Sequence, residues 1–132
     1  SVFKNNKKTR ILGVTILTSL DKKQTLKYYK EKKVEILVKK FANYAKKNNL
    51  SGLVCSPLEI NIVRKEVGKK MILVVPGIRL EKNSFNEKDD QKRTLTPNEA
   101  ITLGADFLVI GRPIIESRNP LETIKKINQS IQ

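Results

Sequence analysis

Four short runs of apolar residues are spaced along the chain, and each one is bounded by polar, glycine or proline residues. The runs cover residues 11–17, 52–55, 71–75 and 107–110. They are rich in Val, Ile and Leu and show no alternation of apolar and polar positions. Continuous apolar runs of this length predict strands that are buried on both faces.

Between these runs, apolar residues recur at the three- and four-residue spacing of an amphipathic helix. We predict one long helix over residues 25–48, which carries this set on one face: Val34, Leu37, Val38, Phe41, Ala42 and Ala45. The pairs Ser56-Pro57, Thr96-Pro97 and Asn119-Pro120 are typical of helix starts, because Ser, Thr and Asn cap a helix and Pro suits its first turn. The corresponding helices should end near Gly68, Gly104 and Ile131.

The predicted order is therefore strand–helix, four times over. Such a repeat is typical of an α/β fold with a parallel sheet covered by helices. Four units correspond to half of an eight-unit barrel or to a small open sheet. We take residues 1–132 as a single partial domain.

The formal net charge of the 132 residues is +14. Residues 1–50 hold 13 Lys and one Arg against three acidic residues, so most of the excess lies there. Lys, Asn and Ile are abundant together, as an AT-rich coding sequence would produce, which favours a solvated face. Attraction of an anionic ligand remains the alternative.

Several functional classes can be set aside from residue types alone. The chain has no His and a single Cys, Cys55, which excludes His-based catalysis, an internal disulfide and a cysteine–histidine metal cluster within it. No apolar run approaches the roughly 20 residues that span a bilayer. The first residues lack the features of a signal peptide, so we expect a cytoplasmic location.

Polar residues follow the predicted strands at three places. They are Thr18 and Ser19, the Pro76–Arg79 turn, and Gly111-Arg112-Pro113. In a parallel sheet these strand ends meet at one edge, where ligands bind. Glycine allows close approach of a ligand and arginine matches phosphate oxygens, so Gly111-Arg112 is a candidate phosphate site. A tight turn with a surface arginine is the alternative.

Residues 79–95 form a long polar stretch without periodicity. Loops of this length usually carry a function or are disordered. The functional interpretation is a loop that closes over an anion and excludes water.

These motifs together resemble the second half of bacterial orotidine 5'-phosphate decarboxylase, in order and at similar spacing. The motifs are Val14-Thr15-Ile16-Leu17-Thr18-Ser19, Gly52-Leu53-Val54-Cys55-Ser56, Val75-Pro76-Gly77-Ile78-Arg79, Asp90-Gln91-Lys92-Arg93, Thr96-Pro97 and Val109-Ile110-Gly111-Arg112-Pro113-Ile114. The resemblance covers about residue 11 to residue 132. It implies a (β/α)8 barrel, usually a homodimer, that makes UMP and CO2 from orotidine 5'-phosphate without a cofactor or metal.

The resemblance also assigns substrate contacts. Thr18 would lie beside the pyrimidine and ribose, and Arg79 and Gln91 would belong to the loop that closes over the phosphate. Gly111 and Arg112 would hold the phosphate through a backbone amide and a guanidinium.

The chain departs from the family in two ways. The family's catalytic Asp-x-Lys-x-x-Asp run is absent, since Leu26 and Leu95 stand where the second acid would follow Asp21 and Asp90. We therefore expect no catalytic residue in this chain, and we expect the Asp/Lys network in a missing N-terminal half. The loop over residues 79–95 is also about three residues longer than is common in bacterial members of the family, with Asn86-Glu87-Lys88 as the extra residues.

Two alternatives stay open. The first is another phosphosugar-binding barrel decarboxylase or synthase of the same superfamily. The second is a basic nucleic-acid-binding module, which Tyr28, Tyr29 and Tyr44 support weakly because they are few and sit on one predicted helix. We expect neither a nucleic-acid nor a membrane partner.

Overall fold

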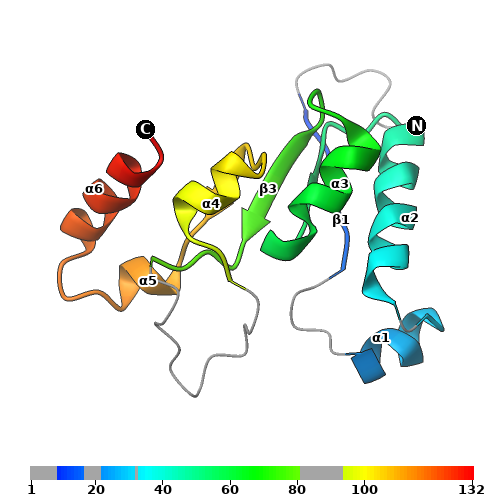
Figure 1. The fold of residues 1–132 in the computed structure, drawn as a ribbon, viewed down its shortest axis with the longest axis horizontal. Helices are drawn as coiled ribbons and strands as arrows, with labels where there is room; N and C mark the ends of the chain where they lie inside the picture. The colour runs from blue at the N-terminus through cyan, green and yellow to red at the C-terminus, as the bar shows by residue number, and fades with distance from the viewer. Residues whose placement is uncertain (1–8, 17–21, 32, 81–93) are drawn as a thin grey trace.

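The computed structural model describes residues 9–16, 22–31, 33–80 and 94–132, and its centre is a four-stranded parallel sheet (Figure 1). The strands are β1 (Leu12–Val14), β2 (Gly52–Val54), β3 (Ile72–Pro76) and β4 (Phe107–Val109). They pair in the order β1-β2-β3-β4. The prediction that the strands are parallel and adjacent in chain order is confirmed.

Helices follow each strand, three of them beginning at Pro57, Pro97 and Pro120, where the sequence predicts a cap. They are α1 (Lys22–Tyr29), α2 (Val34–Lys47), the 3-10 turn η1 (Pro57–Glu59), α3 (Ile60–Val67), α4 (Pro97–Thr102), α5 (Arg112–Ile115) and α6 (Pro120–Ser130). At α4 the Thr96 hydroxyl accepts a bond from the Glu99 amide, and at α6 the Asn119 side chain accepts one from the Glu122 amide. These bonds satisfy amides that the first turn of a helix leaves without partners.

The predicted single helix over residues 25–48 is wrong, because the structure divides it into α1 and α2. Lys30 has φ 56°, a left-handed conformation that ends α1 after Tyr29. The Tyr29 ring meets the Phe41 ring edge-on, with centroids 5.8 Å apart, so α1 packs against α2. Tyr28 and Tyr29 therefore lie on a different helix from Tyr44, contrary to the sequence-based expectation.

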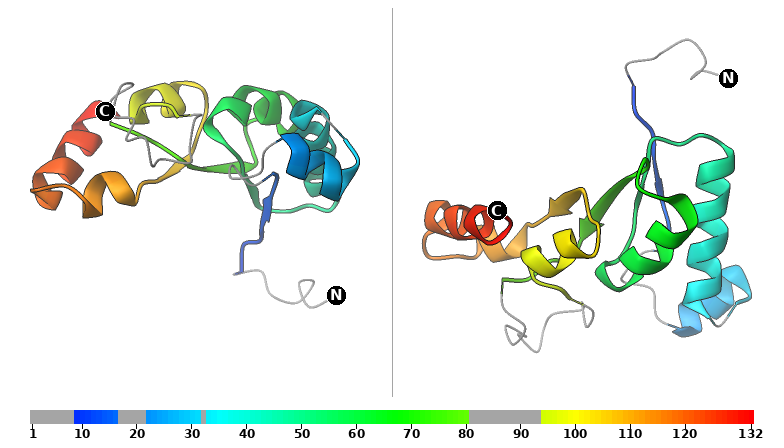
Figure 2. Two further views of the ribbon diagram at one scale, coloured as in Figure 1. Left: turned by 90° about the horizontal axis from the view of Figure 1, so that it is seen from below. Right: turned by 45° about the horizontal axis from the view of Figure 1, so that its top comes forward.

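The two faces of the sheet differ. Helices α2, α3 and α4 cover one face (Figure 2), where Leu53, Leu73 and Val75 are buried among apolar residues of α2 and α3. The alternate residues of the strands point to the opposite face. On the outer strands, Leu12, Val14, Phe107 and Val109 keep between 40% and 57% of their surface exposed. The sheet thus has one packed face and one apolar face that the described residues leave uncovered.

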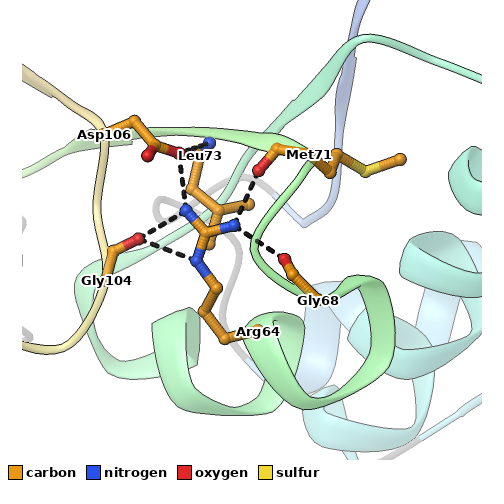
Figure 3. A network of polar contacts seen from close by, with 6 residues as sticks. All are labelled: Arg64, Gly68, Met71, Leu73, Gly104 and Asp106. Carbon is orange, nitrogen blue, oxygen red and sulfur yellow. Dashed lines mark hydrogen bonds and ion pairs between the residues drawn. The ribbon is translucent and has the colours of Figure 1, made fainter.

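The amino-terminal edge of the sheet is held by Arg64 of α3 (Figure 3). Its guanidinium donates to the carbonyl oxygens of Gly104 (2.9 and 2.6 Å), Gly68 (2.8 Å) and Met71 (2.6 Å). It also pairs with Asp106 at 2.5 Å. The same Asp106 oxygen accepts a bond from the Leu73 amide, so one arginine ties α3 to the starts of β3 and β4.

Candidate functional site

The candidate site lies at the carboxyl edge of the sheet, where β3 and β4 end side by side. Pro76 is the register partner of Val109. Arg79 comes three residues after Pro76, and Arg112 comes three residues after Val109. The structure therefore brings these two predicted arginines to the same edge, beyond neighbouring strands.

The segment after β3 turns at Gly77, whose φ of 78° lies in the left-handed region that favours glycine. Ile78 then forms a parallel bridge with Leu95, and the Arg79 amide donates to the Leu95 carbonyl at 3.0 Å. Arg79 is 9% exposed, and its guanidinium donates to the Ile78 carbonyl at 3.1 Å. These bonds join the residues that precede the loop to those that follow it. Residues 81–93 of the loop lie outside the described part of the chain.

Gly111 and Arg112 begin the short helix α5, which the sequence did not predict. Gly111 is exposed, and its carbonyl accepts bonds from the amides of Ile114 and Ile115. A Cβ built on Gly111 would meet nothing within 4 Å, so its backbone faces open space. Arg112 is half-buried at the first position of α5, with Pro113 next to it. A glycine followed by a proline in the first turn was the available signal for this helix.

Two of the predicted contact residues, Thr18 and Gln91, lie outside the described residues. The last described residues after β1 are Thr15 and Ile16. Thr15 and Ile16 lie at the carboxyl end of β1, at the same edge of the sheet as Arg79.

A buried polar cluster joins the ends of β1 and β2, and sequence reasoning did not find it. Glu59 is 6% exposed, and its carboxylate accepts bonds from the Ser56 amide at 3.2 Å and the Thr15 hydroxyl at 3.5 Å. The Thr15 hydroxyl also lies 3.2 Å from the Val54 carbonyl. The Ser56 hydroxyl is buried without a hydrogen-bond partner. The helix-start pattern at Ser56 was the only sequence signal, and the contacts fit a role in holding η1 against the sheet.

The neighbouring Cys55 is a core residue. Burial, followed by the charge of Glu59, raises the pKa of its thiol from 9.0 to about 12, so the thiol is protonated near neutral pH. Among the described residues, no group of three or more His, Cys, Asp and Glu side chains could hold a metal ion. No helix in this part of the chain is long and apolar enough to cross a membrane.

Comparisons with known proteins agree on one group of proteins. A model of the "Orotidine 5'-phosphate decarboxylase / HUMPS family" matches residues 1–127. The chain is 45% identical over 125 residues to the orotidine 5'-phosphate decarboxylase of Coxiella burnetii (strain RSA 331), a match that covers 95% of this chain and 52% of that enzyme. It is 45% identical over 127 residues to the corresponding enzyme of Wolbachia pipientis, covering 95% of this chain and 54% of that enzyme.

Among solved structures, the chain resembles orotidine 5'-phosphate decarboxylase from Lactobacillus acidophilus with a TM-score of 0.74 and 26% identity. That match covers 97% of this chain and 51% of the other. The chain thus spans about half the length of the curated relatives it matches. The comparison confirms the predicted fold class, the C-terminal half of a (β/α)8 barrel.

Proposed function

The chain belongs to the orotidine 5'-phosphate decarboxylase / HUMPS family, and from this premise we propose that it is the phosphate-holding half of an orotidine 5'-phosphate decarboxylase. The complete enzyme would convert orotidine 5'-phosphate to UMP and CO2 in pyrimidine biosynthesis. The observation that carries the proposal is the placement of Gly111-Arg112 and Arg79 beyond adjacent strands at the carboxyl edge.

The chemistry of these residues suits a phosphate dianion. Arginine presents a permanently charged, planar fork of donors that matches two phosphate oxygens. Gly111 leaves its backbone open to a ligand, so that the neighbouring amides can donate to a third oxygen. We assign the phosphate to Gly111 and Arg112.

The remaining contacts follow from the loop and from the end of β1. We assign Arg79 and Gln91 to the closure over the phosphate, with Gln91 also reaching toward the base. We assign Thr18 to the pyrimidine and ribose. The bond between the Arg79 amide and Leu95 supports the loop assignment, because it holds the two ends of this segment together at the site.

The bond-breaking step would use groups outside this chain. Loss of CO2 leaves a carbanion on the pyrimidine ring, which a positioned ammonium can stabilise and protonate. We assign that Lys, and the Asp residues around it, to the other four β/α units. The phosphate-binding site would be remote from the reacting carbon. The free energy of phosphate binding would therefore stabilise the closed, organised active site and take no direct part in bond breaking.

The complete enzyme is proposed to be a cytoplasmic homodimer that needs neither cofactor nor metal. Its ligands would be orotidine 5'-phosphate and UMP, with no nucleic-acid or membrane partner.

Comparing UMP with uridine tests the phosphate assignment, because the two ligands differ only in that group. We expect the chain to bind UMP more tightly than uridine in a calorimetric or NMR titration. Arg112→Ala should lower UMP affinity about tenfold to a hundredfold, as expected for one charge-assisted contact, and leave uridine binding unchanged. Arg118→Ala, which removes an exposed arginine six residues further on, is the control. Equal binding of UMP and uridine by the unmodified chain would contradict the proposal.

A further inference from the structure

Two glutamates occupy the same place in the same kind of helix start. Ser56-Pro57-Leu58-Glu59 opens η1 after β2, and Thr96-Pro97-Asn98-Glu99 opens α4. At each start the glutamate carboxylate accepts a bond from the amide of the capping residue, at 3.2 Å for Ser56 and 3.0 Å for Thr96. Capping of this kind stabilises the start of a helix locally and needs no other part of the fold.

The Glu59 carboxylate also contacts the end of a second strand. Glu59 is 6% exposed, and the oxygen that accepts the Ser56 amide bond lies 3.5 Å from the Thr15 hydroxyl, 44 residues earlier in the chain. The same hydroxyl lies 3.2 Å from the Val54 carbonyl. Because its single proton can point to either acceptor, the Thr15 hydroxyl lies between the carboxylate and the end of β2.

Glu99 offers a matched comparison. One of its carboxylate oxygens accepts bonds from the amide and the hydroxyl of Thr96, at 3.0 Å each, and both donors belong to the cap itself. Glu99 is half-buried, whereas Glu59 is buried. What Glu59 adds to the capping role is the contact with the end of β1.

This contact continues the link between β1 and β2 beyond the backbone ladder. Among the described residues, the last ladder bond between these strands runs from the Thr15 amide to the Val54 carbonyl at 3.0 Å. Further along, the Ser56 amide donates to the Glu59 carboxylate. The side chain of Glu59 therefore takes over from the ladder in fixing the spacing between the ends of β1 and β2.

The cluster leaves one buried polar atom unpaired. Ser56 is 3% exposed, and its hydroxyl has no hydrogen-bond partner in the part of the chain that the structure describes. Native folds seldom leave such a group unpaired. A cluster that only stabilised η1 would be expected to use this hydroxyl in the cap, as the α4 start uses the Thr96 hydroxyl.

The position of the cluster in the sheet relates it to the candidate site. It lies at the carboxyl ends of β1 and β2, and β2 is two strands from β4. Neighbouring strands are roughly 4.8 Å apart, so the cluster lies on the order of 10 Å from the strand end that carries Gly111 and Arg112. Under the proposed function, the ligand's phosphate lies at Gly111 and Arg112 and its nucleoside lies toward β1.

We propose that Glu59 is a positioning residue for the nucleoside part of the ligand. Its carboxylate fixes the ends of β1 and β2 relative to each other, through the Thr15 hydroxyl and the Ser56 amide. Groups that bind a ligand must be held to within roughly 0.5 Å, and bonds from buried groups behind them provide this precision. The inference rests on the proposed function, because that function places the nucleoside at this side of the edge.

The geometry predicts which part of the Glu59 side chain is needed. Both bonds converge on one carboxylate oxygen, Oε2. An amide oxygen at the same place can accept both bonds, so Glu59→Gln should keep the positioning although it removes the charge. Glu59→Leu has no acceptor at this place and should abolish it.

The test measures the affinity of the 132-residue chain for UMP, uridine and inorganic phosphate by calorimetric or NMR titration. Glu59→Leu should weaken binding of UMP and uridine about tenfold each and change phosphate affinity less than about twofold. Glu59→Gln should stay within about threefold of the unmodified chain for all three ligands. Glu99→Leu, which removes the matching carboxylate from the α4 cap, should leave uridine affinity unchanged.

Thr15→Val separates positioning from folding. It removes the hydroxyl at nearly constant volume and leaves the bond from the Ser56 amide to Glu59 in place. We expect it to weaken uridine binding about threefold to tenfold, as the loss of one hydrogen bond would. Circular dichroism checks that each variant is folded, and Thr15→Val carries the test where Glu59→Leu does not fold.

Four results would overturn the positioning role. They are unchanged uridine affinity in the folded Glu59→Leu or Thr15→Val variant, an equal loss in Glu59→Gln, an equal loss in Glu99→Leu, and absence of uridine binding by an unmodified chain that binds UMP. The proposed function fails by a different result, which is equal binding of UMP and uridine by the unmodified chain. Arg112→Ala keeps the two apart, because it should weaken UMP alone, whereas Glu59→Leu should weaken UMP and uridine by the same factor.

Discussion

The two edges of the sheet use arginine in opposite ways. At the amino edge, Arg64 makes five hydrogen bonds within the chain, to the Gly104, Gly68 and Met71 carbonyls and to Asp106. At the carboxyl edge, Arg112 begins a four-residue helix next to a glycine that faces open space. The amino edge has the features of a structural joint, and the carboxyl edge those of a binding site.

The difference shows why residue type alone does not identify a site. Arg64 and Arg112 carry the same charge, but the bonds of Arg64 are all directed at groups that hold α3, β3 and β4 together. In parallel α/β folds, the carboxyl ends of the strands carry function and the amino ends carry stability. Substitutions at the two edges should therefore affect different measurements.

The largest expected effect on stability is that of Arg64→Ala. It removes the donor from three carbonyl oxygens and leaves Asp106 without its partner, so we expect a loss of about 2–4 kcal/mol in the free energy of unfolding. Urea denaturation measures this loss. Lys65→Ala, the exposed neighbour on the same helix, should change stability by less than about 0.5 kcal/mol. Similar urea midpoints for the two variants would contradict the claim that the Arg64 bonds stabilise the fold.

Arg112→Ala should give the opposite result. We expect a stability change below about 1 kcal/mol. In the assembled enzyme, kcat/KM for orotidine 5'-phosphate should fall about tenfold to a hundredfold, as expected for the loss of one phosphate contact. Phosphite dianion should activate turnover of a substrate that lacks the phosphate, and less so in the variant. Unchanged kcat/KM would exclude Arg112 from the site.

Alanine substitutions at Gly104 and Gly111 compare the two edges again, with a smaller expected effect on stability than Arg64→Ala. Gly104 has φ 107°, and a Cβ there would lie 3.1 Å from Nε of Arg64, so Gly104→Ala should cost about 1–3 kcal/mol of stability. The cost should shrink in the Arg64→Ala background, because part of the clash disappears. Gly111→Ala meets no atom within 4 Å and should leave stability nearly unchanged while weakening UMP binding. Equal stability losses at both glycines would contradict the contrast between the edges.

The sequence predicted the order of the strands and most helix starts well. Buried parallel strands require continuous apolar runs, and Thr96-Pro97 and Asn119-Pro120 are local capping signals that do not depend on the rest of the fold. The break between α1 and α2 could not be predicted in this way. It depends on the left-handed backbone conformation of Lys30, and lysine is not a residue type that favours this conformation.

Part of the site could also be predicted from the sequence, because it follows from the parallel order of the strands. Parallel strand ends meet at one edge, which brings Arg79 and Arg112 together without any knowledge of side-chain contacts. The Arg64 network was not predictable, because its partners lie up to 42 residues away in the sequence and three of the acceptors are carbonyls. The substrate assignment depended on the ordered set of motifs that the family shares.

The central claim is that this chain holds the substrate's phosphate but lacks the groups that act on the reacting carbon. The most direct test is to assay UMP formation from orotidine 5'-phosphate, first with the isolated chain and then after adding a separately expressed N-terminal half of the enzyme. We predict no activity above background for either polypeptide alone, and activity on mixing. Activity in the isolated chain would contradict the claim, because the catalytic residues would then lie within these 132 residues.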